Sequence, residues 1–258
     1  MISKLIQYRH LLLMLTWRDI RVRYKQSVMG FLWAIFMPIM IVCAGILVKK
    51  GFSIVSGKPM VFTELASVSV KALPWAFFVG SIRFATNSLT GRSNLVTKIY
   101  FPRAVLPLSS VLTNLFDFAV AAVVLIAILA AAGIGVSIHL FWLPLLLILL
   151  VLVTAAICML LSCTNLFFRD VKYIVEVILT FGIFFTPVFY EVTMFGKWAS
   201  ILLLNPIGSI LEAMNDVVVL HRSPDLFWLT YSACWTVIGS LIGWKVFDKL
   251  EPAFAENI

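Results

Sequence analysis

The sequence predicts an all-α integral membrane protein that forms one domain over residues 1–258, and three observations lead to this fold class. Hydrophobic residues make up 62% of the chain and charged residues 12%, whereas a soluble domain is about half apolar and about a quarter charged. Six apolar segments each approach the ~20 residues that a bilayer requires. Lysine and arginine lie mainly between these segments. A soluble core could not bury so much apolar surface.

Residues 1–26 are predicted to form an amphipathic helix at the cytoplasmic face of the membrane. Apolar residues share one helical arc: Leu5, Ile6, Leu12, Leu13, Trp17 and Ile20. Basic residues occupy the opposite arc: Lys4, Arg18, Arg21 and Lys25. A basic amphipathic helix of this kind lies in the plane of the interface, and this segment carries too many charges to span.

Six transmembrane spans are predicted to follow. Their ranges, in order, are 27–48, 73–91, 105–132, 141–165, 173–190 and 226–247. The second contains Arg83 and the third contains Asp117, and a charge inside the membrane is costly enough to need a partner or a function. We interpret the two as a buried ion pair that fixes the packing of these spans. A polar site facing a translocation path is the alternative.

Residues 191–225 are predicted to form two short re-entrant helices at the outer face, between the fifth and sixth spans. The halves MFGKWASILLL and IGSILEAMNDVVVL are apolar but too short to span, and Asn205-Pro206 separates them. Because proline cannot donate a helical hydrogen bond, this pair marks a break. An ordinary amphipathic outer loop is the alternative.

The orientation of the chain across the membrane is predicted from the distribution of lysine and arginine among its loops. With the N-terminus inside, the cytoplasmic pieces are 1–26, 92–104, 166–172 and the C-terminal tail, and they hold thirteen lysines and arginines against six in the outer pieces. This bias predicts a multi-pass protein with both termini in the cytoplasm.

Several other function classes lack their motifs in this sequence. No G-x-x-x-x-G-K-[ST] phosphate loop occurs, so the chain is not expected to bind ATP, and no catalytic constellation is found. The four cysteines lie in apolar runs without metal-ligand spacing, so no metal is expected. The net charge of +8 comes mostly from residues that flank apolar runs, which membrane lipids explain without nucleic acid as a partner.

Aromatic side chains cluster on two of the predicted spans. The first span carries Phe31, Trp33 and Phe36. The fifth carries Phe181, Phe184, Phe185 and Tyr190. Sugar rings stack their apolar C–H faces on aromatic rings, so such clusters could line a path along which a polar glycan slides. For any single residue, contact with lipid or a neighbouring helix is the alternative.

Four motifs in order resemble those of a known transporter family. They are WRDIRVRYKQSVMGFLWAIFMP at 17–38, NLVTKIYFPRAVLPL at 94–108, NLFFRDVKYI at 165–174 with FFTPVFY at 184–190, and LLNPIGSI at 203–210. Together they resemble the membrane subunit of ABC-type polysaccharide exporters, the permeases for O-antigen, capsule and teichoic acid. The resemblance covers nearly the whole chain.

The resemblance implies a six-span permease that works as a homodimer with two copies of a separate ATPase subunit. ATP and magnesium would bind to that partner, and this chain would be a transport subunit without enzymatic activity or cofactor. The implied substrate is a polyprenyl-diphosphate-linked polysaccharide, moved from the cytoplasmic to the outer face of the bacterial inner membrane. The path would lie between the two copies, lined mainly by first and fifth spans.

The resemblance also assigns roles to particular residues. The interface helix would meet the lipid diphosphate and the ATPase through Arg18, Asp19, Arg21, Tyr24 and Lys25, because guanidinium binds oxyanions bidentately. Two cytoplasmic loops would couple the permease to ATP hydrolysis through Lys98, Pro102, Arg103, Arg169 and Asp170. Membrane headgroup anchoring with local pairing is the alternative for these charges.

O-antigen is the substrate expected first, with capsule or teichoic acid as alternatives. A small-molecule ABC exporter and a membrane-embedded glycan polymerase or ligase are further alternatives. The polymerase or ligase has less support, because the outer segment carries few of the clustered arginines, histidines or carboxylates that such enzymes use.

Overall fold

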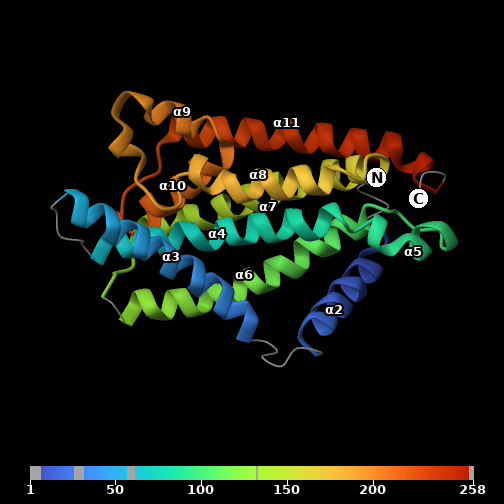
Figure 1. The fold of residues 1–258 in the computed structure, drawn as a ribbon, viewed down its shortest axis with the longest axis horizontal. Coiled ribbons are helices and arrows are strands. Elements are labelled where there is room, and N and C mark those ends of the chain that lie inside the picture. Colours follow the sequence, from blue (N-terminus) through green and yellow to red (C-terminus); the bar gives the residue numbers. More distant parts are fainter. Residues whose placement is uncertain (1–6, 26–31, 57–61, 132, 256–258) are drawn as a thin grey trace.

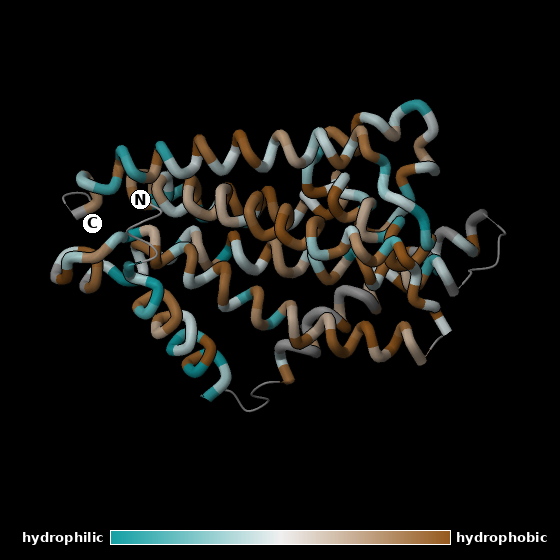
Figure 2. The backbone as a smooth tube through the Cα atoms, turned by 180° about the vertical axis from the view of Figure 1, so that it is seen from behind, coloured by the Kyte–Doolittle hydropathy of each residue, from teal (hydrophilic) through white to brown (hydrophobic). Residues whose placement is uncertain are grey.

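The protein was analysed as a computed structural model, which describes residues 7–25, 32–56, 62–131 and 133–255. All regular elements in these ranges are helices (Figure 1). The predicted all-α fold class is therefore confirmed for the described part of the chain. Brown, apolar residues dominate the long helices, whereas teal and brown alternate along the N-terminal helix α2, Arg9–Lys25 (Figure 2).

Within the described ranges, four stretches are long and apolar enough to cross a membrane. They are Thr63–Thr86, Val105–Ala131, Ile138–Phe167 and Leu226–Phe254. They contain α4 (Phe62–Thr86), α6 (Val105–Ala131), α7 (Leu143–Phe167) with the short helix η2 (Ile138–Trp142), and α11 (Leu226–Leu250) with η4 (Glu251–Ala255). These are the second, third, fourth and sixth predicted spans. The six-span count itself stays a prediction.

The other two predicted spans correspond to α3 (Leu32–Ser56) and α8 (Val171–Phe185). Helix α3 has 25 residues and continues past the predicted end at 48. Helix α8 has 15 residues, about 22 Å at 1.5 Å per residue, which is less than the ~30 Å hydrocarbon core. It ends because Thr186 has extended backbone angles, as the residue before a proline usually does.

The helices form a bundle with α4 at its centre. Helix α4 contacts α3, α6, α7 and α8 along its length, and α7 packs closely against α11 (Figure 1). At this second contact a Cβ on Gly243 would lie 2.9 Å from the carbonyl oxygen of Ala156. The absence of a side chain at Gly243 therefore lets the two helices approach.

The segment between α8 and α11 lies at one end of the bundle, opposite the short helix α5, Ser93–Lys98 (Figure 1). It contains η3 (Val192–Trp198), α9 (Ala199–Leu203) and α10 (Pro206–Val218). The predicted break at Asn205-Pro206 is confirmed: the Asn205 side chain caps α10 by accepting from the Ile207 N–H at 3.1 Å. Helix α10 packs on α4, α7 and α11. The depth of these helices in a membrane stays a prediction.

The end of the bundle near α5 has its own apolar core. Leu15 of α2 packs there with Val96 and Phe101 from the predicted loop at 92–104, and with Phe247 and Phe254 from the C-terminal end. Segments that are far apart in sequence thus form one rigid platform at this end of the molecule.

One basic residue was predicted in the wrong environment. The predicted second span begins at residue 73 and leaves Lys71 among the six basic residues of the outer pieces, but α4 begins at Phe62 and buries Lys71 to 1% exposure. Its Nζ donates to the Tyr190 carbonyl at 2.8 Å and pairs with Glu212 at 3.3 Å. Hydropathy alone predicts that a lysine lies outside a span. Here the Glu212 carboxylate on α10 offsets the free-energy cost of burying the Lys71 ammonium group.

Candidate functional site

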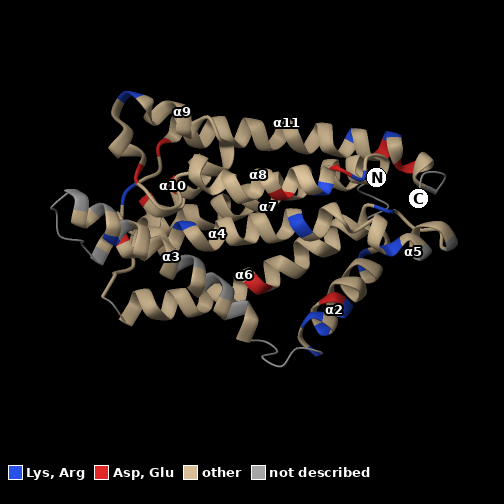
Figure 3. Cartoon of the chain, in the orientation of Figure 1, with Lys and Arg blue, Asp and Glu red and all other residues tan. Residues whose placement is uncertain are grey.

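Helix α2 is held against the bundle by polar contacts in a region where the long helices carry few charges. Charged side chains gather on α2 and at the two ends of the bundle, and few lie along the middle of the long helices (Figure 3). Asp117, on α6, forms an ion pair with Arg23 and accepts a hydrogen bond from the Tyr24 hydroxyl. Arg23 also approaches the Asn114 side-chain oxygen at 3.4 Å. An intramembrane carboxylate therefore serves as the docking point of α2.

Tyr24 contributes as a hydrogen-bond donor. Burial raises the pKa of its phenol above the ordinary value, and the hydrogen bond to Asp117 raises it further. The phenol consequently keeps its proton at physiological pH. As a neutral phenol it donates to the Asp117 carboxylate.

A second polar contact lies nearer the start of α2. Asp19 forms ion pairs with Arg92, in the short helix η1 (Thr90–Arg92), at 2.5 Å and with Arg18 at 3.1 Å. Arg92 also donates to the Ser109 hydroxyl at 3.3 Å. The contacts of Asp19 and Asp117 thus fix α2 at two points about one helical turn apart, since Arg23 and Tyr24 follow Asp19 by four and five residues.

These contacts orient α2 on the bundle. Its buried residues are Leu15, Thr16 and Ile20, whereas Leu13 and Trp17 of the predicted apolar arc are 59% and 53% exposed. The reason is that the ion pairs of Asp19 and Arg23 turn that side of the helix toward the bundle. Arg21 lies off the bundle-facing side, with its guanidinium 5.5 Å from the Trp17 ring.

A cavity of about 920 Å³ lies between α2, α4 and α6. We call it the central cavity. Its charged lining residues are Arg18, Asp19, Arg23, Arg83, Arg92 and Asp117. Its aromatic lining residues are Tyr24, Trp33, Trp75, Phe77, Phe84 and Phe118. The Arg23 guanidinium lies 4.3 Å from the Phe84 ring centre. The cavity therefore joins arginines, which suit phosphate oxyanions, to aromatic faces, which suit sugar rings.

The predicted ion pair between Arg83 and Asp117 is wrong. Arg83 instead contacts Glu176 of α8 through two nitrogens, both at 2.8 Å, while Asp117 pairs with Arg23. Both Arg83 and Glu176 are about half exposed. Arg83 and Asp117 lie at similar positions along adjacent spans, but this does not make them partners. Two side chains must also point toward each other around their helix axes to form an ion pair.

The interface-helix residues predicted to act together divide into two groups. Arg18, Asp19 and Tyr24 line the central cavity. Arg21 and Lys25 are exposed and do not line it. The geometry brings the first three to one site and leaves the other two on the surface of α2.

The predicted aromatic lining divides in a similar way. Trp33 lines the central cavity and lies 5.5 Å from the Phe36 ring. Phe181, Phe184 and Phe185 are exposed on α8. Tyr190 donates from its hydroxyl to the Phe184 carbonyl at 3.0 Å. Phe31 lies outside the described residues.

The cavity also contains aromatic residues that sequence reasoning missed. Phe77 and Phe84 on α4 face the cavity together with Phe118 on α6. A signal for them exists: Phe77, Gly80 and Phe84 recur at i, i+3 and i+7, which places them on one face of a helix.

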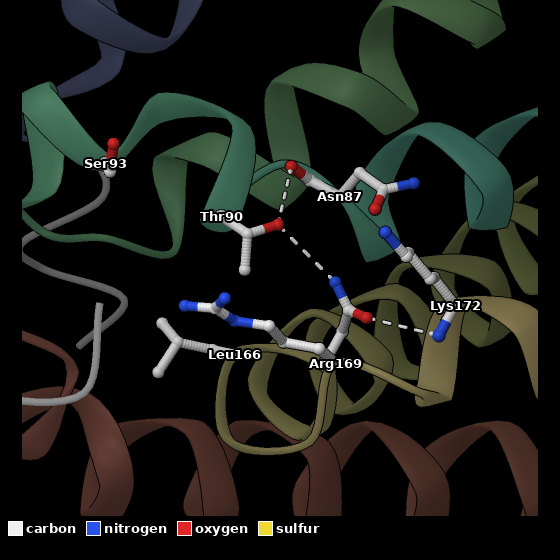
Figure 4. A pocket seen from close by; sticks show the side chains of 7 residues that line it. Asn87, Thr90, Ser93, Leu166, Arg169 and Lys172 are labelled. Carbon is white, nitrogen blue, oxygen red and sulfur yellow. Dashed lines mark hydrogen bonds between the residues drawn. The ribbon is translucent and has the colours of Figure 1, made fainter.

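The predicted coupling residues lie at the end of the bundle near α5. Arg103 donates from its backbone N–H to the Glu251 carboxylate at 2.7 Å and from its guanidinium to the Glu251 carbonyl at 2.5 Å. Pro102 is buried beside it, and Asp170 is exposed just before α8. Arg169 lines a separate pocket of about 260 Å³ (Figure 4). The side chain of Lys98 lies outside the described residues.

Comparison with known proteins agrees with this architecture. The family model for the ABC-2 type transporter matches residues 10–219. The chain is similar to the O-antigen export system permease protein RfbA of Myxococcus xanthus, with 30% identity over 261 residues that cover 100% of this chain and 99% of the relative. Two proteins of the same name from Klebsiella pneumoniae are 27% and 29% identical, and each alignment covers 95% of this chain and 94% of the relative. This chain is therefore a member of the ABC-2 type transporter membrane family.

Proposed function

We propose that this chain is the membrane permease of an ATP-driven exporter that moves a polyprenyl-diphosphate-linked polysaccharide across the bacterial inner membrane. The observation that carries the proposal is the similarity over essentially the full chain to proteins named O-antigen export system permeases. O-antigen is the first substrate to test, with capsule and teichoic acid as alternatives. The direction is from the cytoplasmic to the outer face, with both termini in the cytoplasm and six spans.

The central cavity supports a substrate with a charged head and a sugar chain. Its arginines could hold a diphosphate, since guanidinium groups form paired hydrogen bonds with phosphate oxygens. Arg18 is suited to this role because it shares Asp19 with Arg92, so that two cations face one carboxylate. Trp33, Trp75 and Phe84 offer ring faces in the same cavity for the sugars that follow.

The exposed aromatic surface of α3 and α8 supports a homodimer. Trp33 and Phe36 on α3 and Phe181, Phe184 and Phe185 on α8 are all exposed in the single chain. In the proposed dimer these faces meet across a shared path. Lipid covers the aromatic side chains that the second copy does not contact. A path made by two copies would be lined by the first and fifth predicted spans.

ATP hydrolysis is assigned to two copies of a separate ATPase subunit, which would also hold ATP and magnesium. In the proposal that subunit contacts α2, α5 and the α7–α8 loop at one end of the bundle. Arg103 supports transmission of its movement, because this residue ties the segment at 92–104 to η4 at the end of α11. A push on α5 would therefore reach a long helix directly.

The proposal is tested by deleting the gene and measuring glycan on each side of the inner membrane. We expect lipid-linked glycan to accumulate inside and to disappear from the surface, with wild-type chain restoring export. Arg18→Gln should lower export severalfold, because it removes a cation from the cavity. Lys245→Gln, a change of an exposed lysine on α11, serves as the matched control. Normal surface glycan in the deletion strain would refute the proposal.

A further inference from the structure

A small polar pocket lies apart from the helix contacts that hold α2. It has a volume of about 260 Å³. Its lining comes from the end of α4, from η1 and α5, and from the loop that joins α7 to α8: Asn87, Thr90, Ser93, Asn165, Leu166, Arg169 and Lys172. Only Leu166 is apolar. Because a water molecule takes about 30 Å³, the pocket has room for a small ion with several waters.

Both cations of the pocket point into it. Figure 4 shows the Arg169 side chain extending between Thr90 and Leu166, and the Lys172 side chain reaching toward Asn87. No aspartate or glutamate is part of the lining. Among the described residues neither cation forms an ion pair. Two cations that line one pocket without a carboxylate give it a positive potential, which favours an anion there.

The buried Asn165 side chain joins two walls of the pocket by hydrogen bonds. Asn165 is 2% exposed, donates to the Thr86 carbonyl at 2.9 Å and accepts from the Lys172 backbone N–H at 3.1 Å. The Thr90 hydroxyl also lies 3.5 Å from the Asn165 side-chain nitrogen. These bonds fix the start of α8 against the end of α4. The Lys172 N–H is used by Asn165, and the Val171 and Tyr173 N–H groups donate to the carbonyls of Phe168 and Asp170. A bound anion would therefore be held by side chains.

The position of the pocket relative to the spans identifies the kind of anion. Two membrane-spanning stretches end at Thr86 and Phe167, and the pocket residues follow them within a few positions or belong to their last turn. Lipid phosphates lie at this depth, just outside the hydrocarbon core. Asn87 lines both this pocket and the central cavity. The two sites are therefore neighbours at the α4 surface.

We propose that this pocket is a phosphate-binding site, in which Arg169 and Lys172 neutralise the anion and the Ser93 hydroxyl can donate to it. The phosphate could belong to a lipid headgroup or be free in solution as inorganic phosphate or diphosphate. The site is separate from the cation pairs of α2, and its binding function does not depend on the exported substrate.

The test uses the purified full chain and measures lipid retention by native mass spectrometry. The probes are dioleoyl phosphatidic acid, dioleoylglycerol as its phosphate-free counterpart, and inorganic diphosphate as a soluble competitor. The double variant Arg169→Gln/Lys172→Gln removes both cations of the pocket. The control Lys245→Gln/Lys249→Gln removes two exposed lysines near the C-terminal end of α11, so that the change in net charge is matched.

We expect the pocket variant to lose phosphatidic acid retention at least about tenfold, since two charge-assisted contacts are removed, while the control stays within about twofold of wild type. Displacement by inorganic diphosphate would show that the site accepts free phosphate. Failure of diphosphate to displace the lipid would identify a headgroup site. Either result supports phosphate binding.

Equal retention of phosphatidic acid by the pocket and control variants would overturn the proposal, as would equal retention of dioleoylglycerol and phosphatidic acid by the wild type. If the double variant does not purify as a single species, Arg169→Gln alone replaces it. Arg169 is exposed and its side chain makes no ion pair among the described residues, so this variant should fold. It should lose retention about threefold or more, and unchanged retention would contradict the site.

Discussion

Two carboxylates, Asp117 and Glu176, illustrate how charge among the apolar helices is stabilised in this chain. Asp117 is paired by Arg23 and Tyr24, both on a helix that does not span. Glu176 is paired by Arg83. A carboxylate among apolar helices is tolerated when a cation and a hydrogen-bond donor reach it. These contacts therefore link the N-terminal helix and α8 to the centre of the bundle.

Charge reversal tests the two pairs. Arg23→Asp and Asp117→Arg should each lower the free energy of unfolding by about 1.5–3 kcal/mol, because each leaves like charges in contact. The double variant should recover part of this loss. Arg83→Asp/Asp117→Arg should recover nothing, since these two residues have different partners. Thermal unfolding of the purified protein provides the measurement, and rescue in the second combination would contradict the pairing described here.

The Tyr24 hydroxyl offers a milder test of the same contact. Tyr24→Phe should destabilise the docking of α2 by about 1 kcal/mol, the typical contribution of one hydrogen bond. Limited trypsin digestion at the arginines and lysine of α2 should therefore become about fivefold faster. Tyr100→Phe is the control, because Tyr100 is 90% exposed. Equal digestion rates in the two variants would show that the Tyr24 bond does not hold the helix.

At the scale of elements, the contact of α7 with α11 depends on one small residue. A Cβ at Gly243 would press on the Ala156 carbonyl oxygen at 2.9 Å, whereas nothing lies within 4 Å of a Cβ at Gly239, one turn earlier. Gly243→Ala should destabilise the protein by about 1–3 kcal/mol through overpacking. Gly239→Ala should be neutral or stabilising by up to about 1 kcal/mol. Thermal unfolding of the two variants provides the measurement. Equal stability of Gly243→Ala and Gly239→Ala would contradict the close contact at Gly243.

The link between the segment at 92–104 and η4 is a second property of elements. Arg103 donates to both the carbonyl and the carboxylate of Glu251 and to the Val96 carbonyl. Arg103→Gln removes the two guanidinium bonds but keeps the backbone N–H bond to the Glu251 carboxylate, and should speed amide hydrogen exchange at 99–104 and 251–255 about tenfold. Lys249→Gln, an exposed neighbour, is the control. Unchanged exchange in both variants would mean that the apolar core alone holds these segments together.

Hydropathy predicted the helices well and their partners poorly. The spans near 105–132 and 141–165 match α6 and α7 closely because uninterrupted apolar runs have clear ends. The start of α4 was missed by eleven residues because Lys71 resembles a loop residue until Glu212 is known to lie beside it. The partner of Asp117 was missed because Arg23 lies on another helix, 94 residues earlier in the sequence. Both misses concern contacts between distant segments, which periodicity does not encode.

At the scale of the whole molecule, the single chain combines a platform, a cavity and an exposed aromatic surface. The platform near α5 joins α2, the 92–104 segment and the C-terminal end. The central cavity opens beside it, and the aromatic side chains of α3 and α8 remain uncovered by the chain itself. This division agrees with the proposed work of a permease, in which one end receives force, a cavity binds the lipid-linked substrate, and a second copy completes the path.

The most direct test is transport by the chain reconstituted in proteoliposomes with its ATPase partner and a polyprenyl-diphosphate-linked glycan. The glycan's accessibility to an added glycosidase reports which side of the membrane it occupies. The proposed function predicts an ATP-dependent change in accessibility that is lost when this chain is omitted and falls severalfold with Arg18→Gln. ATP hydrolysis without any movement of the glycan, or movement that is unaffected by omitting the chain, would contradict it.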